Sequence, residues 1–331
     1  MRTLISVLSI VTGVCMSSTL YASVYAQRPE VIKFINDIAI EHNIDKSQAI
    51  KALGQISKSD EIIKRMTTQY EALPWHKYQA MLVTEKRIQG GIKFWSEYAD
   101  ILQKAEQEFG VPAQLIVAII GVESSYGASS GKYPVLQALA TLAFDYPPRA
   151  DFFKNELKEY LLLITEQRLD PLALKGSYAG AMGMPQFIAS SYRNFAVDFD
   201  NSGQIDLHNN IPQVIGSVAN YFKVHGWKPG DQVIHKAKIK GTKHKKLQVA
   251  ARNNPVPITP LTILKQHGVT PMVKIKDPNT QVALLEFNNG KETEYWLGMN
   301  NFYVITRYNN SSNYALAVHQ LGAAIRKSYK P

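Results

Sequence analysis

The stretch LIVAIIGVESSYG, residues 115–127, determines the fold class that we predict for this chain. Its first eight residues have no polar face, which is typical of a buried helix rather than an amphipathic surface helix. Glu123 follows directly, although glutamate is rarely buried without a partner. In apolar surroundings the pKa of a carboxyl group rises, and the group then keeps a proton that it can deliver as a general acid. Two interpretations stay open at this point: a general acid, or a helix-terminal side chain that reaches solvent.

The composition indicates a globular protein with an anionic partner. The chain has 331 residues, which is enough for about two domains with a sizeable core. Its formal net charge is +10. A basic surface suits nucleic acid, anionic lipid or an acidic polymer such as cell-wall glycan, and charge does not choose among them. The Lys- and His-rich stretch 236–246 fits a polyanion patch, but a solvated loop is the interpretation that we favour.

The N-terminus predicts export. Residues 1–26 combine Arg2, an apolar run and small residues, which is the pattern of a secretory signal peptide cleaved before Gln27. No later apolar run approaches membrane-spanning length, so we expect a soluble, exported protein. Cys15 is the single cysteine and lies within this segment. A lipid anchor on Cys15 is the less favoured alternative, because Val14 before it is bulky where such a signal has a small residue.

The remaining chain predicts a mainly α (α+β) fold. Helical periodicity or composition marks five segments: 27–70, 93–109, 135–169 with a break at 146–149, 215–224 and 314–325. From about residue 231 the apolar runs shorten, and strands are expected at 282–287, 294–297 and 302–305. We therefore predict a helical body over 27–230, a small β-rich domain over 231–300 and a C-terminal segment 301–331 that returns to the helical core.

Residues 198–209, DFDNSGQIDLHN, have the spacing of a calcium-binding EF-hand loop. Asp198, Asp200 and Ser202 stand at positions 1, 3 and 5, and Gly203 stands where the chain must turn sharply. The twelfth position is Asn209 rather than the bidentate glutamate. We expect either a weak structural cation site or an Asx-rich turn without metal. A calcium sensor is disfavoured because a single degenerate loop does not make a switchable helix pair.

Several motifs in order along the chain resemble the lytic murein transglycosylases of glycoside hydrolase family 103. The resemblance runs from about residue 70 to the C-terminus and includes the EF-hand-like loop. The other motifs that carry it are GVESSYG at 121–127, ALATLAF at 138–144, GAMGMPQF at 180–187, SSY at 190–192, IGSVANYF at 215–222 and FYVITRYN at 302–309.

The resemblance implies a lysozyme-like helical core that cleaves peptidoglycan between N-acetylmuramic acid and N-acetylglucosamine. The β-1,4 bond would break without water and leave a 1,6-anhydromuramic end. Glu123 would act first as the acid and then as the base, without a catalytic cofactor. This agrees with the residues themselves, because we find no second acidic residue in a comparable apolar motif, and a hydrolase needs two carboxylates. A lysozyme-type muramidase and a noncatalytic peptidoglycan-binding module are the alternatives.

The resemblance also implies which residues bind the glycan strand. Gln186 and Phe187 are expected beside the catalytic centre, Ser177 near Glu123 or the sugar, and Arg149 at a peptide or lactyl carboxylate. Asn309 is expected to bind an acetamido or hydroxyl group. Ring faces and hydroxyls are expected from four tyrosines, namely Tyr78, Tyr221, Tyr308 and Tyr314.

For the EF-hand-like loop, the resemblance implies a weak structural Ca2+ or Na+ held by five residues. These are Asp198, Asp200, Ser202, Gln204 and Gln213. Members of the family often have an acidic residue just before the IGSVANYF segment, whereas this chain has Gln213, which brings no charge and would bind through its amide oxygen. We further predict a periplasmic monomer that acts on glycan strands, spans no membrane and binds no nucleic acid.

Overall fold

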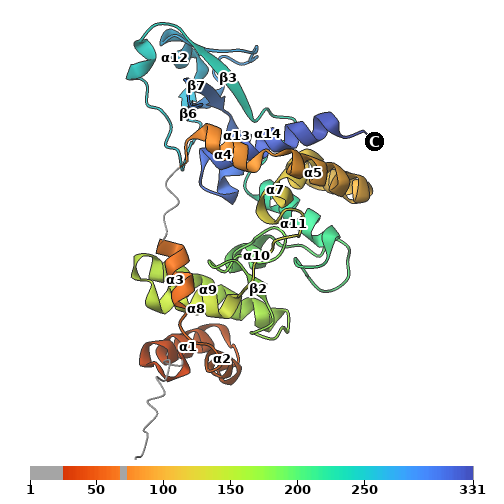
Figure 1. Ribbon diagram of the computed structural model, residues 1–331, viewed down its shortest axis with the longest axis vertical. Helices are drawn as coiled ribbons and strands as arrows, with labels where there is room; N and C mark the ends of the chain where they lie inside the picture. Colours follow the sequence, from red (N-terminus) through yellow and green to blue (C-terminus); the bar gives the residue numbers. More distant parts are fainter. Residues whose placement is uncertain (1–24, 68–72, 331) are drawn as a thin grey trace, which may run out of the picture.

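One end of the molecule is formed by helices from two separate parts of the chain. The computed structural model describes residues 25–67 and 73–330. In it, α3 packs on α8, and α8 packs on α9, so that the N-terminal helices lie beside a later helical pair (Figure 1). The five helices of this end are α1 (Pro29–His42), α2 (Lys46–Leu53), α3 (Asp60–Thr67), α8 (Val135–Asp145) and α9 (Ala150–Glu166). The helices predicted over 27–70 are confirmed as far as Thr67, beyond which residues 68–70 lie outside the described ranges. The helices predicted over 135–169 are confirmed together with their break, which is the short 3-10 helix η2 at Pro147–Arg149.

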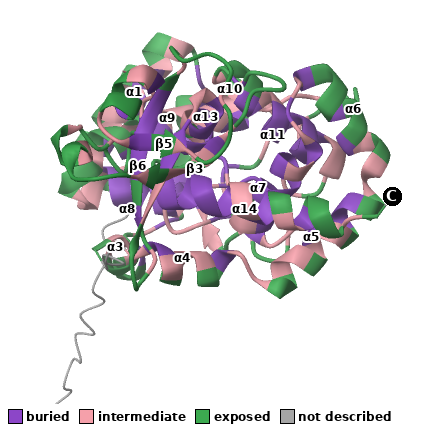
Figure 2. Ribbon diagram, turned by 90° about the horizontal axis from the view of Figure 1, so that it is seen from above, coloured by how far each residue is buried: buried purple, intermediate pink, exposed green. Residues whose placement is uncertain are grey.

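The middle of the molecule is built around α7 (Ala113–Ser124), the helix that contains the apolar run 115–122. It packs against four other helices, and all of its residues from Leu115 to Gly121 are buried (Figure 2). Burial on every side explains why the helix has no polar face. The four packing partners are α5 (Glu85–Glu97), α6 (Ala99–Phe109), α11 (Ile211–Val224) and α14 (Ser312–Ser328).

A tyrosine ring fixes the close approach of α5 and α7. The hydroxyl of Tyr126 donates to the carbonyl of Arg87 at 2.7 Å, and its ring lies against three glycines. A Cβ atom would come within 2.7 Å of this side chain at Gly90 and at Gly91, and within 2.4 Å at Gly121. Real Cβ atoms do not approach other atoms so closely, so glycine at these positions makes room for the ring.

A five-stranded antiparallel sheet forms the opposite end of the molecule (Figure 1). The strand order is β4-β6-β7-β3-β5, and the central pair, β6 and β7, aligns Leu284 with Leu297. The predicted strands at 282–287 and 294–297 are confirmed. The elements are β3 (Ile234–Ile239), β4 (Thr259–Pro260), α12 (Leu261–Gln266), β5 (Val269–Pro271), β6 (Gln281–Asn288) and β7 (Thr293–Gly298).

This end of the molecule has a small core of its own. Six buried residues make up that core: Leu261, Leu264, Val269, Val282, Leu284 and Leu297. They come from α12 and from strands β5, β6 and β7. The domain boundaries at 230 and 300 remain predictions.

The prediction of a strand at 302–305 is wrong. These residues belong to α13 (Asn300–Tyr308), where Phe302, Val304 and Ile305 are buried. A short apolar run that is buried on more than one side has the same composition in a helix and in a strand, so the pattern did not distinguish them. The shorter elements are α4 (Trp75–Leu82), β1 (Tyr133–Pro134), β2 (Lys175–Gly176), α10 (Ala189–Phe195), and the 3-10 helices η1 (Tyr25–Gln27) and η3 (Lys243–Lys246).

The architecture confirms the predicted mainly α class with a small β-rich part. Most of the predicted signal peptide, including Cys15, lies outside the described residues. In the part of the chain that is described, no single helix is both long and apolar enough to cross a membrane. The pair α6 and α7 meets that test only jointly, and the pair is bent by 113°.

Candidate active site

Glu123 lies in the last turn of α7, where the local sequence ends the helix abruptly. The two residues after the end of the helix, Ser125 and Tyr126, adopt left-handed backbone conformations with φ of 51° and 61°. A left-handed residue is a common way to end a helix. The hydroxyl of Ser124 accepts a hydrogen bond from the backbone N–H of Gly127 at 3.0 Å, which ties the turn to the helix end. The carboxylate is therefore held on a rigid element at the edge of the core.

The electrostatic environment of Glu123 suits a proton donor. Burial raises the pKa of its carboxyl group to about 7, although a hydrogen bond from Tyr314 lowers it. The Tyr314 hydroxyl donates to Oε1 of Glu123 at 2.5 Å. A carboxyl group with a pKa near 7 is protonated in an appreciable fraction of molecules at neutral pH and can both give and take a proton. The geometry thus favours the general acid over a freely solvated side chain.

Three tyrosines from different helices surround this carboxyl group. Tyr78 lies on α4, Tyr308 ends α13, and Tyr314 lies in the first turn of α14. Burial is the main reason why the pKa of all three hydroxyls is raised, and the negative charge of Glu123 raises it further. They therefore stay protonated and can donate hydrogen bonds. The structure brings together four of the residues predicted from the sequence: Glu123, Tyr78, Tyr308 and Tyr314.

An aromatic cluster supports the Tyr308 ring. The ring centroid of Tyr308 lies 4.7 Å from that of Tyr221, 5.8 Å from that of Phe187 and 5.6 Å from that of Phe222. Phe187 and Tyr221 are buried, and the hydroxyl of Tyr221 donates to the carbonyl of Arg307 at 2.5 Å. In this structure both rings position Tyr308, and their predicted contact with substrate stays a prediction.

The glycine-rich segment around residues 176–187 makes the close approaches expected of it. A Cβ atom on Gly183 would lie 2.4 Å from the carbonyl oxygen of Leu207. Gln186 has a φ of 52°, and its Nε2 donates to the carbonyl of Ser130, in the loop after α7, at 3.0 Å. The hydroxyl of Ser177 accepts from two backbone N–H groups of its own turn. Gln186 therefore connects this segment to the end of the Glu123 helix.

Comparison with known proteins agrees with this arrangement. A model of the transglycosylase SLT domain matches residues 26–323. The chain belongs to this family. The membrane-bound lytic murein transglycosylase B of Escherichia coli is 40% identical to this SLT-domain chain in an alignment 319 residues long, which covers 91% of this chain and 84% of the relative.

Two solved structures show the same SLT-domain fold. The catenated lytic transglycosylase SltB1 of Pseudomonas aeruginosa is 41% identical, with a TM-score of 0.87 over 92% of this chain and 99% of that one. An Escherichia coli lytic transglycosylase solved in complex with calcium is also 41% identical, with a TM-score of 0.83 over 92% of this chain and 95% of that one.

Two predicted ligands of this SLT-domain chain are exposed. Arg149 lies between α8 and α9, and its guanidinium stacks on Phe152, 4.3 Å from the ring centroid. Asn309 directly follows α13. Both side chains face solvent, and their roles in binding remain predictions.

A second buried carboxylate was missed in the sequence. Glu156 on α9 accepts hydrogen bonds from the backbone N–H and the hydroxyl of Ser190, at 3.0 and 2.8 Å. Burial raises the pKa of this group. Ser190 lies in the first turn of α10, so Glu156 satisfies free N–H groups at a helix start. The alternation of buried and exposed positions along α9 gave no sign of this contact, because the partner lies 34 residues away.

In the EF-hand-like loop of this SLT-domain chain, the predicted ligand Gln213 is fully buried. It lies in the first turn of α11, and its side-chain nitrogen faces Asp198, Asp200 and Ser202. Among residues 25–67 and 73–330, no three or more His, Cys, Asp or Glu side chains converge as they would around a metal ion. The residues predicted to bind an ion in this loop are two carboxylates and three neutral groups.

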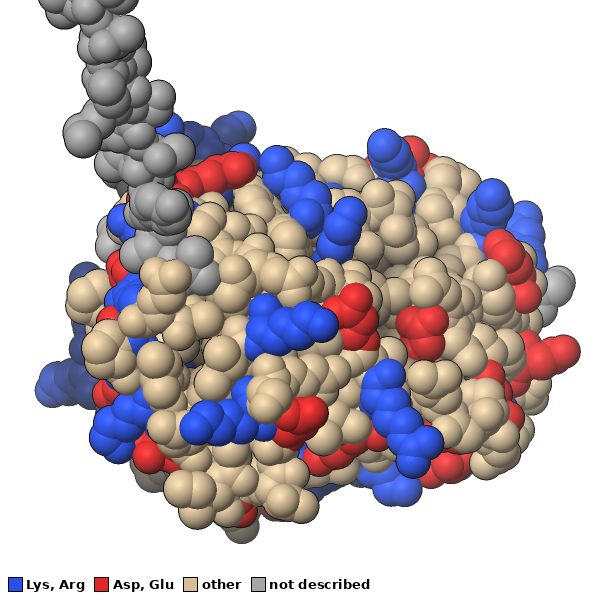
Figure 3. Space-filling model, turned by 90° about the horizontal axis from the view of Figure 1, so that it is seen from below, with Lys and Arg blue, Asp and Glu red and all other residues tan. Residues whose placement is uncertain are grey.

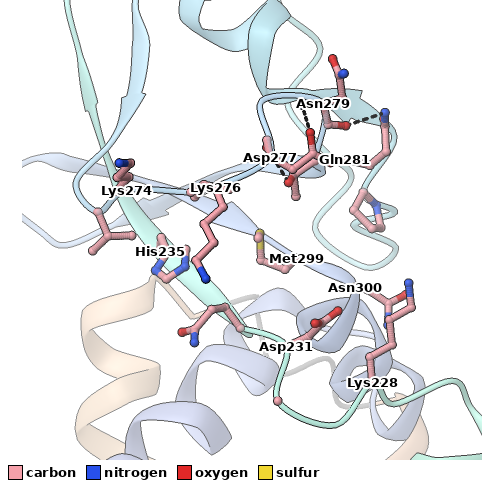
Figure 4. Close-up of a pocket in the computed structure, with 16 residues that line it drawn as sticks. Lys228, Asp231, His235, Lys274, Lys276, Asp277, Asn279, Gln281, Met299 and Asn300 are labelled. Atoms are coloured by element: carbon pink, nitrogen blue, oxygen red, sulfur yellow. Dashed lines mark hydrogen bonds between the residues drawn. The ribbon is translucent and has the colours of Figure 1, made fainter.

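The SLT-domain chain also has a pocket of about 1070 Å³ between the sheet and the start of α13 (Figure 4). Lys228, Asp231, His235, Lys276 and Met299 line it, among others. None of its lining residues is one that the sequence predicted for the site. The pocket is therefore distinct from the cluster around Glu123.

Proposed function

We propose that this chain is a lytic transglycosylase that cleaves the β-1,4 bond between N-acetylmuramic acid and N-acetylglucosamine in peptidoglycan. The observation that carries the proposal is the partly buried Glu123, whose pKa is raised to about 7 beside the Tyr314 hydroxyl. Membership in the transglycosylase SLT domain family supports the reaction class, as does the name of the Escherichia coli relative.

In the proposed reaction, one carboxyl group performs both proton transfers. Protonated Glu123 gives its proton to the glycosidic oxygen as the bond from that oxygen to C1 of the muramic sugar breaks. The N-acetyl carbonyl of the same sugar stabilises the positive charge that develops at C1. The Glu123 carboxylate then takes the proton of the C6 hydroxyl, whose oxygen bonds to C1 and forms the 1,6-anhydro ring. The Tyr314 hydroxyl stabilises the carboxylate between these two transfers.

The surroundings of Glu123 favour this reaction over a lysozyme-type hydrolysis. A retaining hydrolase carries a second carboxyl group about 5 Å away, and its charge would raise the pKa of the acid. Within the described ranges, the pKa of Glu123 is shifted by burial and by Tyr314 alone. This environment supports the C6 hydroxyl of the substrate as the nucleophile.

The proposal includes a place of action and a partner. The predicted signal peptide and the peptidoglycan substrate support a periplasmic enzyme that acts on glycan strands, and the monomeric state stays a prediction. Nucleic acid is not part of the proposal. On the face drawn in Figure 3, Lys and Arg side chains alternate with Asp and Glu instead of forming one basic patch.

Digestion of purified murein sacculi tests the proposal. We expect soluble muropeptides with 1,6-anhydromuramic ends by mass spectrometry, and a loss of at least about 100-fold in rate for Glu123→Gln. Glu108→Gln, which makes the same change on an exposed residue of α6, is the control and should keep full activity. Products with reducing muramic ends would mean a muramidase, and sacculus binding without turnover would mean a binding module.

A further inference from the structure

The side chain of Gln213 fills the centre of the EF-hand-like loop. Its Nε2 atom lies 3.0 Å from Oδ1 of Asp198, 2.9 Å from Oδ1 of Asp200 and 2.8 Å from Oγ of Ser202. It also lies 2.6 Å from the backbone carbonyl oxygen of Gln204. These four oxygens stand at positions 1, 3, 5 and 7, which are the positions that direct oxygens at Ca2+ in an EF-hand. In this chain they are directed at an amide nitrogen.

The orientation of this amide is fixed by its oxygen. Oε1 of Gln213 accepts a hydrogen bond from the backbone N–H of Asp206 at 2.6 Å. An amide rotated by half a turn would place its NH2 group against that N–H and its oxygen against four other oxygens, so both ends would be repelled. The backbone N–H of Gln213 also donates to the side chain of Asn210, the N-cap of α11, at 3.3 Å. The side chain thus starts from an anchored helix turn.

We propose that the Gln213 amide replaces the cation of this loop, so that the loop folds without Ca2+ or Na+. Calcium binds oxygen ligands at about 2.3–2.6 Å, and Nε2 occupies the same volume. The amide is neutral, so the charges of Asp198 and Asp200 are offset by other donors. The backbone N–H of Ser202 donates to Asp198 at 2.9 Å, and Nδ2 of Asn210 donates to Asp200 at 2.7 Å.

This proposal separates the chain from its relative that was solved with calcium. It also replaces the expectation that Gln213 binds an ion through its amide oxygen. That oxygen already accepts from Asp206, and a cation would enter only if the buried side chain left its place. The structural role of the ion, which is to hold the loop closed, is then performed by a side chain of the protein.

Calcium titration of the full chain tests the inference independently of activity. After treatment with EDTA, the wild-type chain should show no change in Tm on addition of 1 mM CaCl2 or on exchange of choline chloride for NaCl, and no saturable heat in calorimetry. Gln213→Glu places a third carboxylate at the centre. Its Tm should fall in EDTA and rise by about 5 °C in 1 mM CaCl2, as expected for a site with a Kd of about 10 µM.

Gln103→Glu, the same change on an exposed residue of α6, is the matched control and should not respond to Ca2+. Stoichiometric binding of Ca2+ by the wild-type chain would overturn the proposal. So would a Gln213→Glu variant that folds but ignores Ca2+, because the oxygens would then not converge on a cation-sized centre. If that variant does not fold, the wild-type Gln213 side-chain NH2 signals decide by NMR. Slow exchange and no shift with CaCl2 support the proposal, and signals that move on titration refute it.

Discussion

Replacing Glu123 by glutamine should change the pH dependence of stability as well as abolish activity. The side chain keeps its shape, and its amide oxygen still accepts from Tyr314, so the two proteins differ mainly in one titratable proton. In the wild-type chain the pKa of Glu123 rises from an ordinary 4.5 to about 7 because the group is buried. The unfolded chain therefore releases a proton between these two pH values that the folded chain retains.

The magnitude follows from the difference between these pKa values. A pKa difference from 4.5 to about 7, at 1.36 kcal/mol for each pH unit, corresponds to about 3 kcal/mol. Since the folded state binds more protons in this range, the contribution of Glu123 to the free energy of unfolding is fully present below pH 4.5. This contribution is lost as the pH rises through 7. The glutamine variant has no such proton. Its stability relative to the wild-type chain should therefore increase by about 3 kcal/mol from pH 4 to pH 8.

Urea denaturation of both proteins at pH 4 and pH 8, followed by circular dichroism, measures this difference. Glu108→Gln on the exposed face of α6 is the control, and its stability relative to the wild-type chain should be the same at the two pH values. A stability difference for Glu123→Gln that does not change with pH, or that changes in the opposite direction, would refute the claim that burial holds the proton on Glu123.

Three further predictions concern the groups around this carboxylate and the core. Tyr314→Phe removes the hydrogen bond that lowers the pKa of Glu123, so the basic limb of the pH–activity profile should move up by about one pH unit, and a limb that stays or moves down would contradict the assignment. Gly121→Ala should cost about 1–3 kcal/mol in urea denaturation, because its Cβ would lie 2.4 Å from the Tyr126 hydroxyl, and an unchanged midpoint would show that the ring has room to move. Glu156→Ala should cost about 1–3 kcal/mol because the start of α10 loses its acceptor, while activity per folded molecule should persist; a fall in that specific activity would instead connect Glu156 to the chemistry.

The sequence predicted the features of this chain that depend on local pattern. The uniform apolarity of residues 115–122 correctly indicated a helix buried on all sides, and the helices at both ends of the chain followed from periodicity. The run at 302–305 was misassigned because a short apolar segment satisfies both the helical and the strand pattern. The single segment predicted at 93–109 is in fact parts of two helices, which meet at Tyr98.

The contacts between distant segments could not be predicted from the sequence. The hydrogen bond from Tyr314 to Glu123 and the contact of Glu156 with Ser190 join different helices, and composition does not specify such pairs. Gln213 was identified as part of the loop, but the direction of its amide depends on the backbone N–H of Asp206. These are properties of the packed molecule, in which each polar group is paired by its surroundings.

The hydrogen bond between α14 and Glu123 has a consequence for when the enzyme becomes active. Tyr314 follows Glu123 by 191 residues, and α14 is the last helix among the described residues. A growing or truncated chain contains the acid long before it contains the helix that buries it and donates to it. Such a chain exposes an ordinary carboxylate on an uncovered apolar helix. The capacity of Glu123 to hold and deliver a proton at neutral pH therefore arises only once α14 has been made and has docked against α7.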